Sequence, residues 1–543
     1  MTSLSVPLPP KRRVLYIRHR RKADLSDAFR MNQDEWVETL SKLADVALAA
    51  EDFDMDELCD RVQPDFILYE SPGLDAENLK IENPAAHAGI PRFGFQMQDP
   101  QCSTRVGFLR VVEKLNIQWI FTHLAEASIR QSPELKDRTF SVSLLFDDAV
   151  FRDYGLPKDI PVSVFGASTA PEIYHWRTDV VRDIADHFPT FIYTHPGYRK
   201  PTPRHKFPVV GEAYARLLNR SYFSLADTTR FDYLVRKHLE IPASGAVLVS
   251  PDTPALKPYG FKDMENCVLG KGRALFDKIA ALADNPDLYE RIRKNGHDLA
   301  HGKYTGKNWR GILDFYECFK TLKPGETIQQ QGFLGPFKIV PLGAVPLPAI
   351  AADCPDSEIS LSIKDWLQSL LNGGSLNDME SRLSKMADWI YHVEESFVPL
   401  GIMMLLKGDT GQAIELLQRP QAARAKSTEY NGYDPEEIAW LSLAASLSGN
   451  TRLISLTRKE SAPMRHRSLR RMQWLGQILA AGRDASNPPP DVGQSLPGDR
   501  LSVHWLGQID LQDWLNLIRR ILEANGQSGI LRIDKSMRGK SKR

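Results

Sequence analysis

Residues 230–266, RFDYLVRKHLEIPASGAVLVSPDTPALKPYGFKDMEN, change character in their middle and decide the fold. A helix-like run over 231–239 ends in a turn of small residues that starts at Glu240, and the apolar run 246–250 then predicts a short buried strand. A loop rich in proline and glycine follows. Open α/β sheets build ligand crevices from such a succession, at the carboxyl ends of their strands, so Glu240 marks a candidate site.

The totals describe an ordinary globular protein. The chain has 543 residues, which at roughly 100–200 residues per domain predicts about three domains. Its 69 Lys and Arg nearly balance 68 Asp and Glu, so there is no overall field that favours nucleic acid or an anionic membrane. The five cysteines lack any CxxC spacing and indicate reduced thiols. With no signal-peptide core and no run of ~18 apolar residues, we expect a cytoplasmic protein.

Short apolar runs alternate with helix-like stretches and predict parallel sheets wrapped by helices. In the first part, strands are expected at 13–18, 66–69, 93–96, 119–122 and 142–146, with a helix at 36–48. A second series follows a turn-rich stretch near Lys158, with strands at 160–166, 190–194, 222–225 and 246–249 and helices at 172–187, 211–219 and 273–283. Two such series predict two lobes with a cleft between them.

The predicted fold class is α/β, with two Rossmann-like lobes followed by an all-α domain. We place the first lobe at residues 1–157, the second at 158–329, a proline-rich linker at 330–357 and the helical domain at 358–543. 

In the helical domain, Gly373, Gly408 and Gly449 follow leucine-rich stretches at intervals of 35 and 41 residues, close to the ~34-residue unit of tetratricopeptide arrays. A glycine there suits the turn between paired helices, where φ is positive. An ordinary helical bundle with glycine caps explains the same spacing.

Glu240 could bind a ribose, because a carboxylate beside a tight turn can accept hydrogen bonds from both hydroxyls of a diol. A nearby helix N-terminus would favour a diphosphate. A solvated glutamate at the end of a helix is the alternative, and Glu240 by itself does not decide between the two.

The sequence around Glu240 resembles the carboxyl-terminal half of GT-B nucleotide-sugar glycosyltransferases, in particular the CgeB-like, spore-maturation type group. The resemblance rests on Lys237 three residues before Glu240, the small-residue turn that ends in Gly245, the apolar strand after it, and the loop that ends in Asn266. The hinge-like stretch 146–167 and the helical tail 276–296 are also similar. The likeness is clear over about residues 147–310.

This resemblance implies that the second lobe binds a nucleotide-diphosphate sugar as substrate, with no cofactor and no metal. Gly166 would let the diphosphate approach the backbone, and Arg177 would bind its oxygens, a role that suits a bidentate guanidinium. A surface arginine and a turn glycine are the alternatives. Lys237, Glu240, Gly245 and Asn266 complete the implied donor site.

Two residues depart from the family pattern. Many retaining members of the wider class have a glutamate eight positions before the one at Glu240, and here that position is Asp232. Lys237 stands in place of the usual arginine, which keeps the charge but removes the bidentate fork.

Candidate catalytic bases lie at the ends of predicted strands. The first lobe offers Glu70, Asp99 and His123, of which we place Asp99 first, although an aspartate before a proline commonly forms a turn. His195 ends a strand of the second lobe and is the other catalytic candidate, with an ordinary loop histidine as the alternative.

Asp52, Asp54 and Asp56 contain the Asp-x-Asp spacing by which the other nucleotide-sugar fold holds a metal. They precede a helix-like run, where acidic residues favour the helix start, so we interpret them as helix capping.

We therefore predict a metal-independent glycosyltransferase that moves a sugar from a nucleotide-diphosphate donor to an unidentified acceptor, a protein or surface glycan among the possibilities. The helical domain would bind a protein partner or the acceptor. The alternative is a non-catalytic interaction scaffold with a degenerate GT-B core. Asp232 and Lys237 favour the scaffold, whereas Gly166, Arg177, Lys237 and Glu240 together oppose it.

Overall fold

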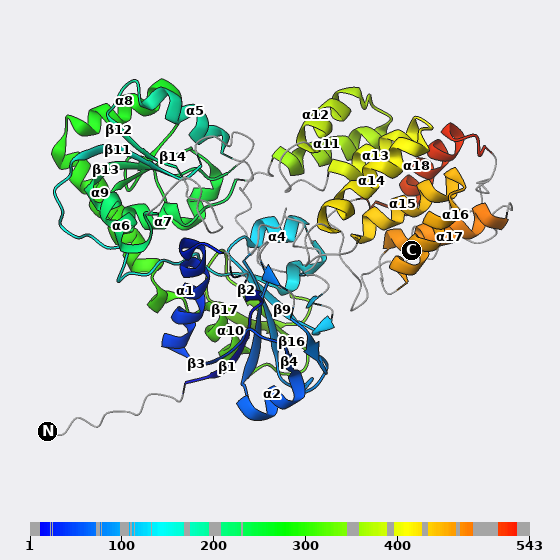
Figure 1. Cartoon of the computed structure of the whole chain (residues 1–543), viewed down its shortest axis with the longest axis horizontal. Coiled ribbons are helices and arrows are strands. Elements are labelled where there is room, and N and C mark those ends of the chain that lie inside the picture. Colours follow the sequence, from blue (N-terminus) through cyan, green and yellow to red (C-terminus); the bar gives the residue numbers. More distant parts are fainter. Residues whose placement is uncertain are drawn as a thin grey trace. The chain divides into compact units, whose positions relative to one another are not determined.

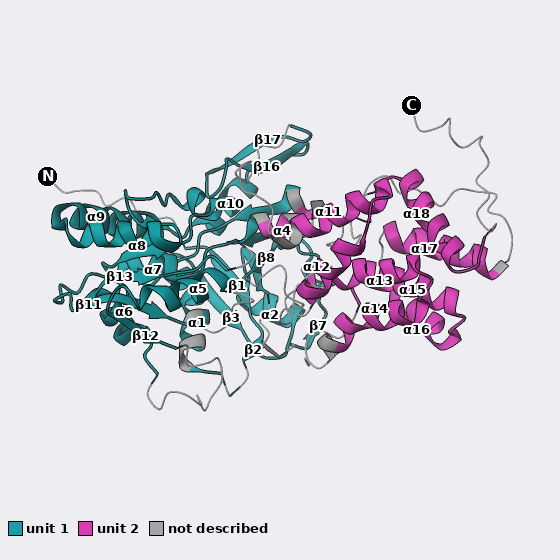
Figure 2. Cartoon of the chain, turned by 90° about the horizontal axis from the view of Figure 1, so that it is seen from above, with its two compact units in different colours: residues 1–97, 114–125, 137–357 teal, residues 98–113, 126–136, 358–543 magenta. Residues whose placement is uncertain are grey.

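The structure is a computed structural model in which the chain forms two compact units (Figure 2). Unit 1 contains residues 1–97, 114–125 and 137–357, and unit 2 contains residues 98–113, 126–136 and 358–543. The residues that the structure describes are 11–21, 23, 25–71, 76–77, 79–97, 108, 111–112, 114–131, 133–167, 174–194, 208–229, 232–344, 358–387, 396–425, 433–462, 467–481, 506 and 509–528.

The first lobe of unit 1 is built on a parallel sheet whose described strands run in the order β10-β9-β8-β5-β1-β3 (Figure 1). Its strands are β1 (Arg13–Ile17), β3 (Asp45–Ala49), β5 (Phe66–Glu70), β8 (Arg92–Gln96), β9 (Trp119–Thr122) and β10 (Thr139–Ser141). The other elements are α1 (Asp27–Leu43), α2 (Met55–Val62) and the short strands β2 (Arg20–Arg21), β4 (Phe53–Asp54), β6 (Ala76–Glu77) and β7 (Ile81–Glu82). Between β9 and β10 the chain forms α4 (Ala125–Gln131) and η1 (Pro133–Arg138), most of whose residues belong to unit 2. Strands β5 and β8 are buried throughout, as expected of a parallel sheet covered on both faces.

Two expectations for this lobe are wrong. The helix predicted at 36–48 ends at Leu43, and residues 45–49 form β3, which pairs in parallel with β1. Sheet pairing thus overrides the helical period of the sequence after Ala44, whose backbone is extended. The strand expected at 142–146 lies three residues earlier, as β10. The apolar side chains of residues 142–146 are buried in the core, and the run pairs only through an isolated bridge between Phe146 and Thr305, so burial rather than strand structure explains it.

The second lobe contains a parallel sheet with the described strand order β12-β11-β13-β14-β15. Its strands are β11 (Ile160–Phe165), β12 (Thr190–Tyr193), β13 (Ser221–Leu225), β14 (Val247–Ser250) and β15 (Val268–Leu269). The helical elements are α5 (His175–Ile184), α6 (Gly211–Arg220), α7 (Lys237–Ala243), η2 (Pro254–Tyr259), α8 (Gly272–Ala283), α9 (Pro286–Lys303) and η3 (Gly306–Asn308).

The strand order of both lobes confirms the predicted fold class. Counted along the chain, the second-lobe strands lie in the order 2-1-3-4-5, and the first-lobe sheet begins in the same way from β3. This is a doubly wound order, in which ligands bind at the carboxyl ends of the strands where the order reverses. In the second lobe the reversal lies between β11 and β13, so the residue after β11, Gly166, stands at that point.

The helix predicted at 231–239 is displaced along the chain. Helix α7 begins at Lys237 and runs through Glu240 and Pro242 to Ala243. Asp232 lies before it in a turn with a φ of +63°, a conformation that a short polar side chain tolerates and that a helix excludes.

After the second lobe the chain returns to the first. Phe315 on α10 (Gly311–Phe319) contacts Phe93, Phe121 and Phe140 of the first-lobe sheet, with ring centroids 4.9–5.5 Å apart. The hairpin of β16 (Glu326–Gln330) and β17 (Phe337–Pro341) follows, and the Gln330 side chain accepts a hydrogen bond from the backbone N–H of Ser141. The first part of the predicted linker 330–357 is therefore a hairpin strand rather than a loop.

Unit 2 is helical in the residues that the structure describes beyond 357 (Figure 2). Its helices are α11 (Glu358–Asn372), α12 (Asn377–Ala387), α13 (Phe397–Leu406), α14 (Thr410–Ala425), α15 (Pro435–Ser448), α16 (Thr451–Ser461), α17 (Arg467–Ala481) and α18 (Leu511–Ala524). Gly373, Gly408 and Gly449 each lie between two consecutive helices with φ of +67° to +79°, as the spacing predicts. The tetratricopeptide assignment stays a prediction.

Within the described part of the chain, no helix has the combined length and apolar character needed to cross a bilayer.

The return of α10 to the first lobe predicts a large effect of Phe315→Ala. Phe315 is fully buried among aromatic rings, and a Phe→Ala change in such a core costs about 3–5 kcal/mol. We expect a clear fall in the urea midpoint of unfolding, followed by tryptophan fluorescence. Glu317→Ala on the same helix is the control, because it removes only surface ion pairs with Arg12 and Lys320, each worth about 1 kcal/mol or less. Equal midpoints for the two variants would contradict this packing.

Candidate functional site

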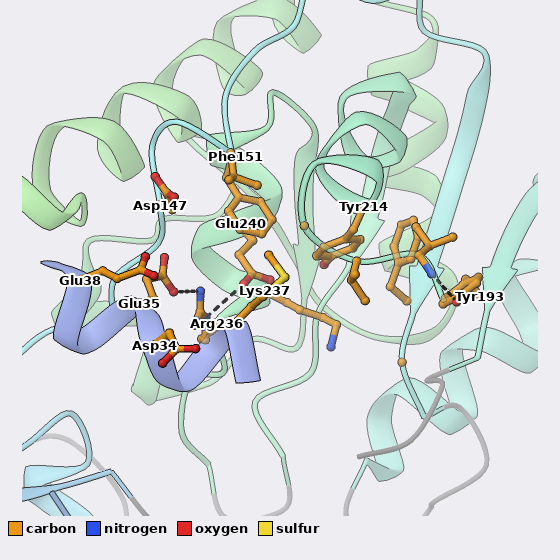
Figure 3. Close-up of a pocket in the computed structure, with 17 residues that line it drawn as sticks. Asp34, Glu35, Glu38, Asp147, Phe151, Tyr193, Tyr214, Arg236, Lys237 and Glu240 are labelled. Carbon is orange, nitrogen blue, oxygen red and sulfur yellow. Dashed lines mark hydrogen bonds and ion pairs between the residues drawn. The ribbon is translucent and has the colours of Figure 1, made fainter. Parts of the chain in front are cut away.

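A cavity of about 280 Å³ opens within unit 1, between α1 of the first lobe and the second lobe (Figure 3). On the first-lobe side it is lined by Asp34, Glu35 and Glu38 from α1, and the stretch between the lobes contributes Asp147 and Phe151. From the second lobe come Phe165, Gly166, Tyr193, Tyr214, Arg236, Lys237 and Glu240. One wall is thus acidic, and the opposite wall carries cations.

Two cations, Arg177 and Lys237, approach Gly166 closely. It follows β11 directly and has a φ of +117°, a backbone conformation that residues other than glycine rarely adopt. A Cβ built on Gly166 would lie 3.3 Å from Nη1 of Arg177 and 3.3 Å from Nζ of Lys237. The bare backbone of Gly166 therefore leaves room for both positive groups at the carboxyl end of β11.

Arg177 is fixed by its surroundings on α5. Only 1% of the residue is exposed, its backbone N–H donates to Oδ2 of Asp227 at 2.9 Å, and its guanidinium lies over the ring of Tyr174, 4.0 Å from the centroid. Asp227 follows β13 and is itself buried; burial raises the pKa of its carboxyl, and the neighbouring Arg177 opposes that rise. Asp227, which follows β13, thus binds the backbone of Arg177. Gly166, which follows β11, leaves room for the Arg177 guanidinium.

Lys237 opens α7 and completes the pair of cations. Burial first, and then the charge of Arg177, lower the pKa of its amine to about 8, although Glu240 opposes both. Among the described residues, no carboxylate lies within 4 Å of Lys237 Nζ. An anion placed between Lys237 and Arg177 would relieve the repulsion between them.

Glu240 lies one turn after Lys237 with 6% of its surface exposed. Its Oε1 is 3.2 Å from Nε of Arg236, which fixes one of its oxygens. Burial and the charge of this carboxylate raise the pKa of the nearby Tyr214, which also lines the cavity. Glu240 is therefore a held carboxylate on the cavity wall rather than a solvated helix end.

Arg236 also forms an ion pair with Glu35 of α1, so a chain of charges runs from the first lobe to Glu240 (Figure 3). Burial raises the pKa of Glu35, and the charges of Glu240 and Asp147 add to this rise. Arg236 opposes them, and the net pKa is about 7.

The structure brings Gly166, Arg177, Lys237 and Glu240 together, but not the other two predicted donor residues. Gly245 precedes β14 and so lies at the opposite end of the sheet from the crevice. Its carbonyl accepts a hydrogen bond from Lys158 Nζ at 2.6 Å, and its φ of +78° is a turn conformation that favours glycine. 

Asn266 is used within its own loop. Its Oδ1 accepts from the Lys262 N–H at 2.8 Å, and its Nδ2 donates to the Gly260 carbonyl at 2.9 Å. It precedes β15 and does not line the cavity.

The catalytic candidates Asp99 and His195 lie outside the described residues, so both stay predictions. Glu70 ends β5 but is buried against the Tyr16 hydroxyl, and burial raises the pKa of its carboxyl to about 7. Burial lowers the pKa of His123 to about 4, with a smaller contribution from Arg236. His123 is therefore neutral at neutral pH.

Asp54 acts as the helix cap that its spacing suggests. Its side chain accepts from the backbone N–H groups of Asp56 and Glu57 at the start of α2, which confirms the capping interpretation.

Three polar residues of the cavity, Glu35, Tyr214 and Arg236, were not singled out from the sequence. The sequence could have indicated Arg236, because it stands four residues before Glu240 and residues at this spacing can form an ion pair on one helix face. Glu35 and Tyr214 lie on amphipathic helices without a local motif, and only the folded chain brings them to Glu240.

Comparison with known families supports the site on the second lobe. Residues 155–311 match the profile of a family described as glycosyl transferase-like. This match contains Gly166, Arg177, Lys237 and Glu240, so the segment that carries these four predicted donor residues is similar to that family. No curated protein sequence matches the chain.

Solved structures of sugar transferases also align with the chain, weakly. Sucrose-phosphate synthase from Thermosynechococcus elongatus has a TM-score of 0.38 at 9% identity and covers 57% of this chain and 99% of that one. Anabaena HepE in complex with UDP-glucose has a TM-score of 0.35 at 11% identity, covering 57% and 100%. A glycosyltransferase from Rickettsia africae has 0.34 at 9%, covering 56% and 98%. Because these TM-scores and sequence identities are low, the fold assignment rests on the strand order of the two sheets.

The repulsion between the two cations predicts the titration of Lys237. Its amine should titrate near pH 8, and Arg177→Gln should raise its pKa, because it removes a neighbouring positive charge. Nuclear magnetic resonance of ¹³C-methylated lysines would follow this titration. Arg182→Gln, an exposed change on the same helix, is the control and should leave the Lys237 titration unchanged. A Lys237 titration that ignores Arg177→Gln would show that the two charges do not lie together.

Proposed function

We propose that this protein is a glycosyltransferase that moves a sugar from a nucleotide-diphosphate donor bound by the second lobe. The observation that carries the proposal is a pair of cations, the buried Arg177 and the partly exposed Lys237, which both approach the bare backbone of Gly166. This pair stands at the switch point of a doubly wound sheet, where such folds bind their ligands.

A diphosphate suits this place because it supplies the negative charge that two desolvated cations require. Arg177 offers a planar fork for two phosphate oxygens, and Lys237 a compact point charge. When the sugar leaves, negative charge grows on the diphosphate, and cations already in position stabilise that charge without reorganisation. The proposal therefore assigns leaving-group stabilisation to Arg177 and Lys237 and no step to a metal ion.

Glu240 is placed to bind the ribose of the same donor. It lies one turn of α7 from Lys237, and its carboxylate can accept from two neighbouring hydroxyls. The transferred sugar would then lie toward the first lobe, from which the acceptor enters. A base from the first lobe, for which Asp99 stays the first candidate, would take the proton of the acceptor hydroxyl.

We further assign the chain to the CgeB-like group, on the resemblance around Lys237 and Glu240. The helical unit would bind the acceptor or a protein partner, in the way that paired-helix arrays present a concave surface.

Titration with nucleotides separates the parts of the proposed site. We expect a nucleoside diphosphate, among UDP, ADP and GDP, to bind the full-length protein in a calorimeter. Glu240→Gln should weaken that binding about tenfold, as expected for loss of a hydrogen bond to a charged group, and leave inorganic pyrophosphate unaffected. Lys237→Gln should weaken both ligands, because its partner is the diphosphate.

The exposed Lys262→Gln is the matched control for Lys237→Gln and should bind like the unaltered protein. If none of the three nucleotides binds, the proposed function is wrong. If Glu240→Gln weakens pyrophosphate as much as the nucleotide, Glu240 does not contact the ribose.

The role of the helical unit has its own test. Removing residues 358–543 should leave nucleoside diphosphate affinity unchanged and lower transfer to the native acceptor, measured by release of the nucleoside diphosphate. Undiminished transfer would show that the helical unit does not bring the acceptor to the enzyme.

A further inference from the structure

Glu35 is a first-lobe carboxylate that reaches into the donor site. It lies on α1, lines the cavity and forms an ion pair with Arg236, the residue directly before α7 (Figure 3). Its side chain is 10% exposed and that of Arg236 17%, so water screens this pair only in part. A contact of this kind links the first lobe to the residues that bind the donor.

Arg236 is shared between two carboxylates. Besides Glu35, it contacts Glu240 through Nε, 3.2 Å from Oε1, and the Glu240 side chain is 8% exposed. The carboxylate that the ribose needs is thus engaged by a guanidinium before any ligand arrives. A ribose diol that binds both oxygens of Glu240 must compete with Arg236 for one of them.

Glu35 has the capacity to take Arg236 away from Glu240. Its Oε2 already pairs with Arg236, and its Oε1 is buried with no hydrogen-bond donor among the described residues. A guanidinium can donate two parallel hydrogen bonds to one carboxylate. Glu35 can therefore accept both from Arg236 once the ribose claims Glu240.

We propose that Glu35 is a positioning residue for the nucleotide: when ionised it holds Arg236 and so leaves the Glu240 carboxylate available to the ribose diol. The inference rests on the proposed function, because it takes Glu240 as the ribose-binding group. Glu35 acts through Arg236 and Glu240 and does not itself touch the nucleotide. Nucleotide binding in the second lobe is in this way linked to helix α1 of the first.

The linkage has a pH dependence whose sign follows from the charge of Glu35. Burial raises the pKa of Glu35 to about 7. Below that pH the Glu35 side chain is neutral, Arg236 stays with Glu240, and the nucleotide binds more weakly. Above that pH Glu35 is charged and binding is stronger.

The charges around Glu35 come from three elements. Arg236 and Glu240 lie at α7, Asp147 lies between the lobes, and Asp34 and Glu38 share α1 with Glu35. Asp34 is paired with Arg18 and Arg21, which hold its pKa below the usual value.

Calorimetric titration of UDP, ADP and GDP into the full-length protein, at pH 6 and pH 8.5, tests the inference. At pH 8.5, Glu35→Gln should weaken the nucleoside diphosphate that binds about tenfold, the effect of one charge-assisted hydrogen bond. At pH 6 the ratio of the two affinities should fall toward one, because Glu35 is already neutral. Ionisation of the nucleotide cancels in this ratio, and inorganic pyrophosphate should show no difference at either pH.

A double-variant cycle distinguishes positioning from direct contact. Glu35→Gln combined with Glu240→Gln should bind no more weakly than Glu240→Gln alone, because Glu35 acts only through that carboxylate. Glu35→Asp keeps the charge and should retain the pH dependence. Lys42→Gln, an exposed change on the same helix outside the cavity, is the control and should match the unaltered protein.

Each result has one meaning. Equal affinities of Glu35→Gln and the unaltered protein at pH 8.5 would overturn the inference while the proposed function stands. Additive losses in the double variant would show that Glu35 contacts the ligand directly and would also overturn it. If no nucleoside diphosphate binds the unaltered protein, the proposed function fails, and this inference fails with it.

Discussion

The site depends on two positive charges that the fold holds close together, the buried Arg177 and the partly exposed Lys237. Arg177 and Lys237 approach the same glycine, Gly166, although a buried charge is costly unless a partner compensates it. Asp227 and Tyr174 stabilise Arg177, and burial lowers the pKa of Lys237. A sheet that places its switch point beside Gly166 concentrates positive charge where an anionic ligand binds. The proposed donor site follows from this arrangement.

Much of the architecture can be predicted from the sequence, because buried parallel strands appear as short apolar runs. The strands at β1, β5, β8, β9 and β11 to β14 lie where those runs are. The errors have local causes. Residues 46–48 follow the helical period of α1, yet they pair with β1. The apolar run 142–146 is buried but forms no strand beyond an isolated bridge from Phe146 to Thr305. Neither sheet pairing nor burial without pairing leaves a mark in a single stretch of sequence.

The residues of the cavity likewise divide into those that the sequence indicates and those that it does not. Gly166, Lys237 and Glu240 could be named because each stands beside a strand or turn in a recognisable order, and the fold gathers them with Arg177. Gly245 belonged to the same motif, but its positive φ and its carbonyl bond to Lys158 serve the turn before β14. Glu35 could not be found, since 201 positions separate it from Arg236 (236 minus 35) and only the closure of the two lobes pairs them. Contacts between lobes carry no short-range sequence signal.

The central claim is that the diphosphate of a nucleotide lies between Arg177 and Lys237. A crystal structure of the full-length protein with a bound nucleoside diphosphate tests it most directly. The account predicts phosphate oxygens about 3 Å from Arg177 Nη1 and Lys237 Nζ, with the ribose hydroxyls at the same distance from the Glu240 carboxylate. A diphosphate bound elsewhere, with Arg177 and Lys237 touching no phosphate oxygen, would contradict it.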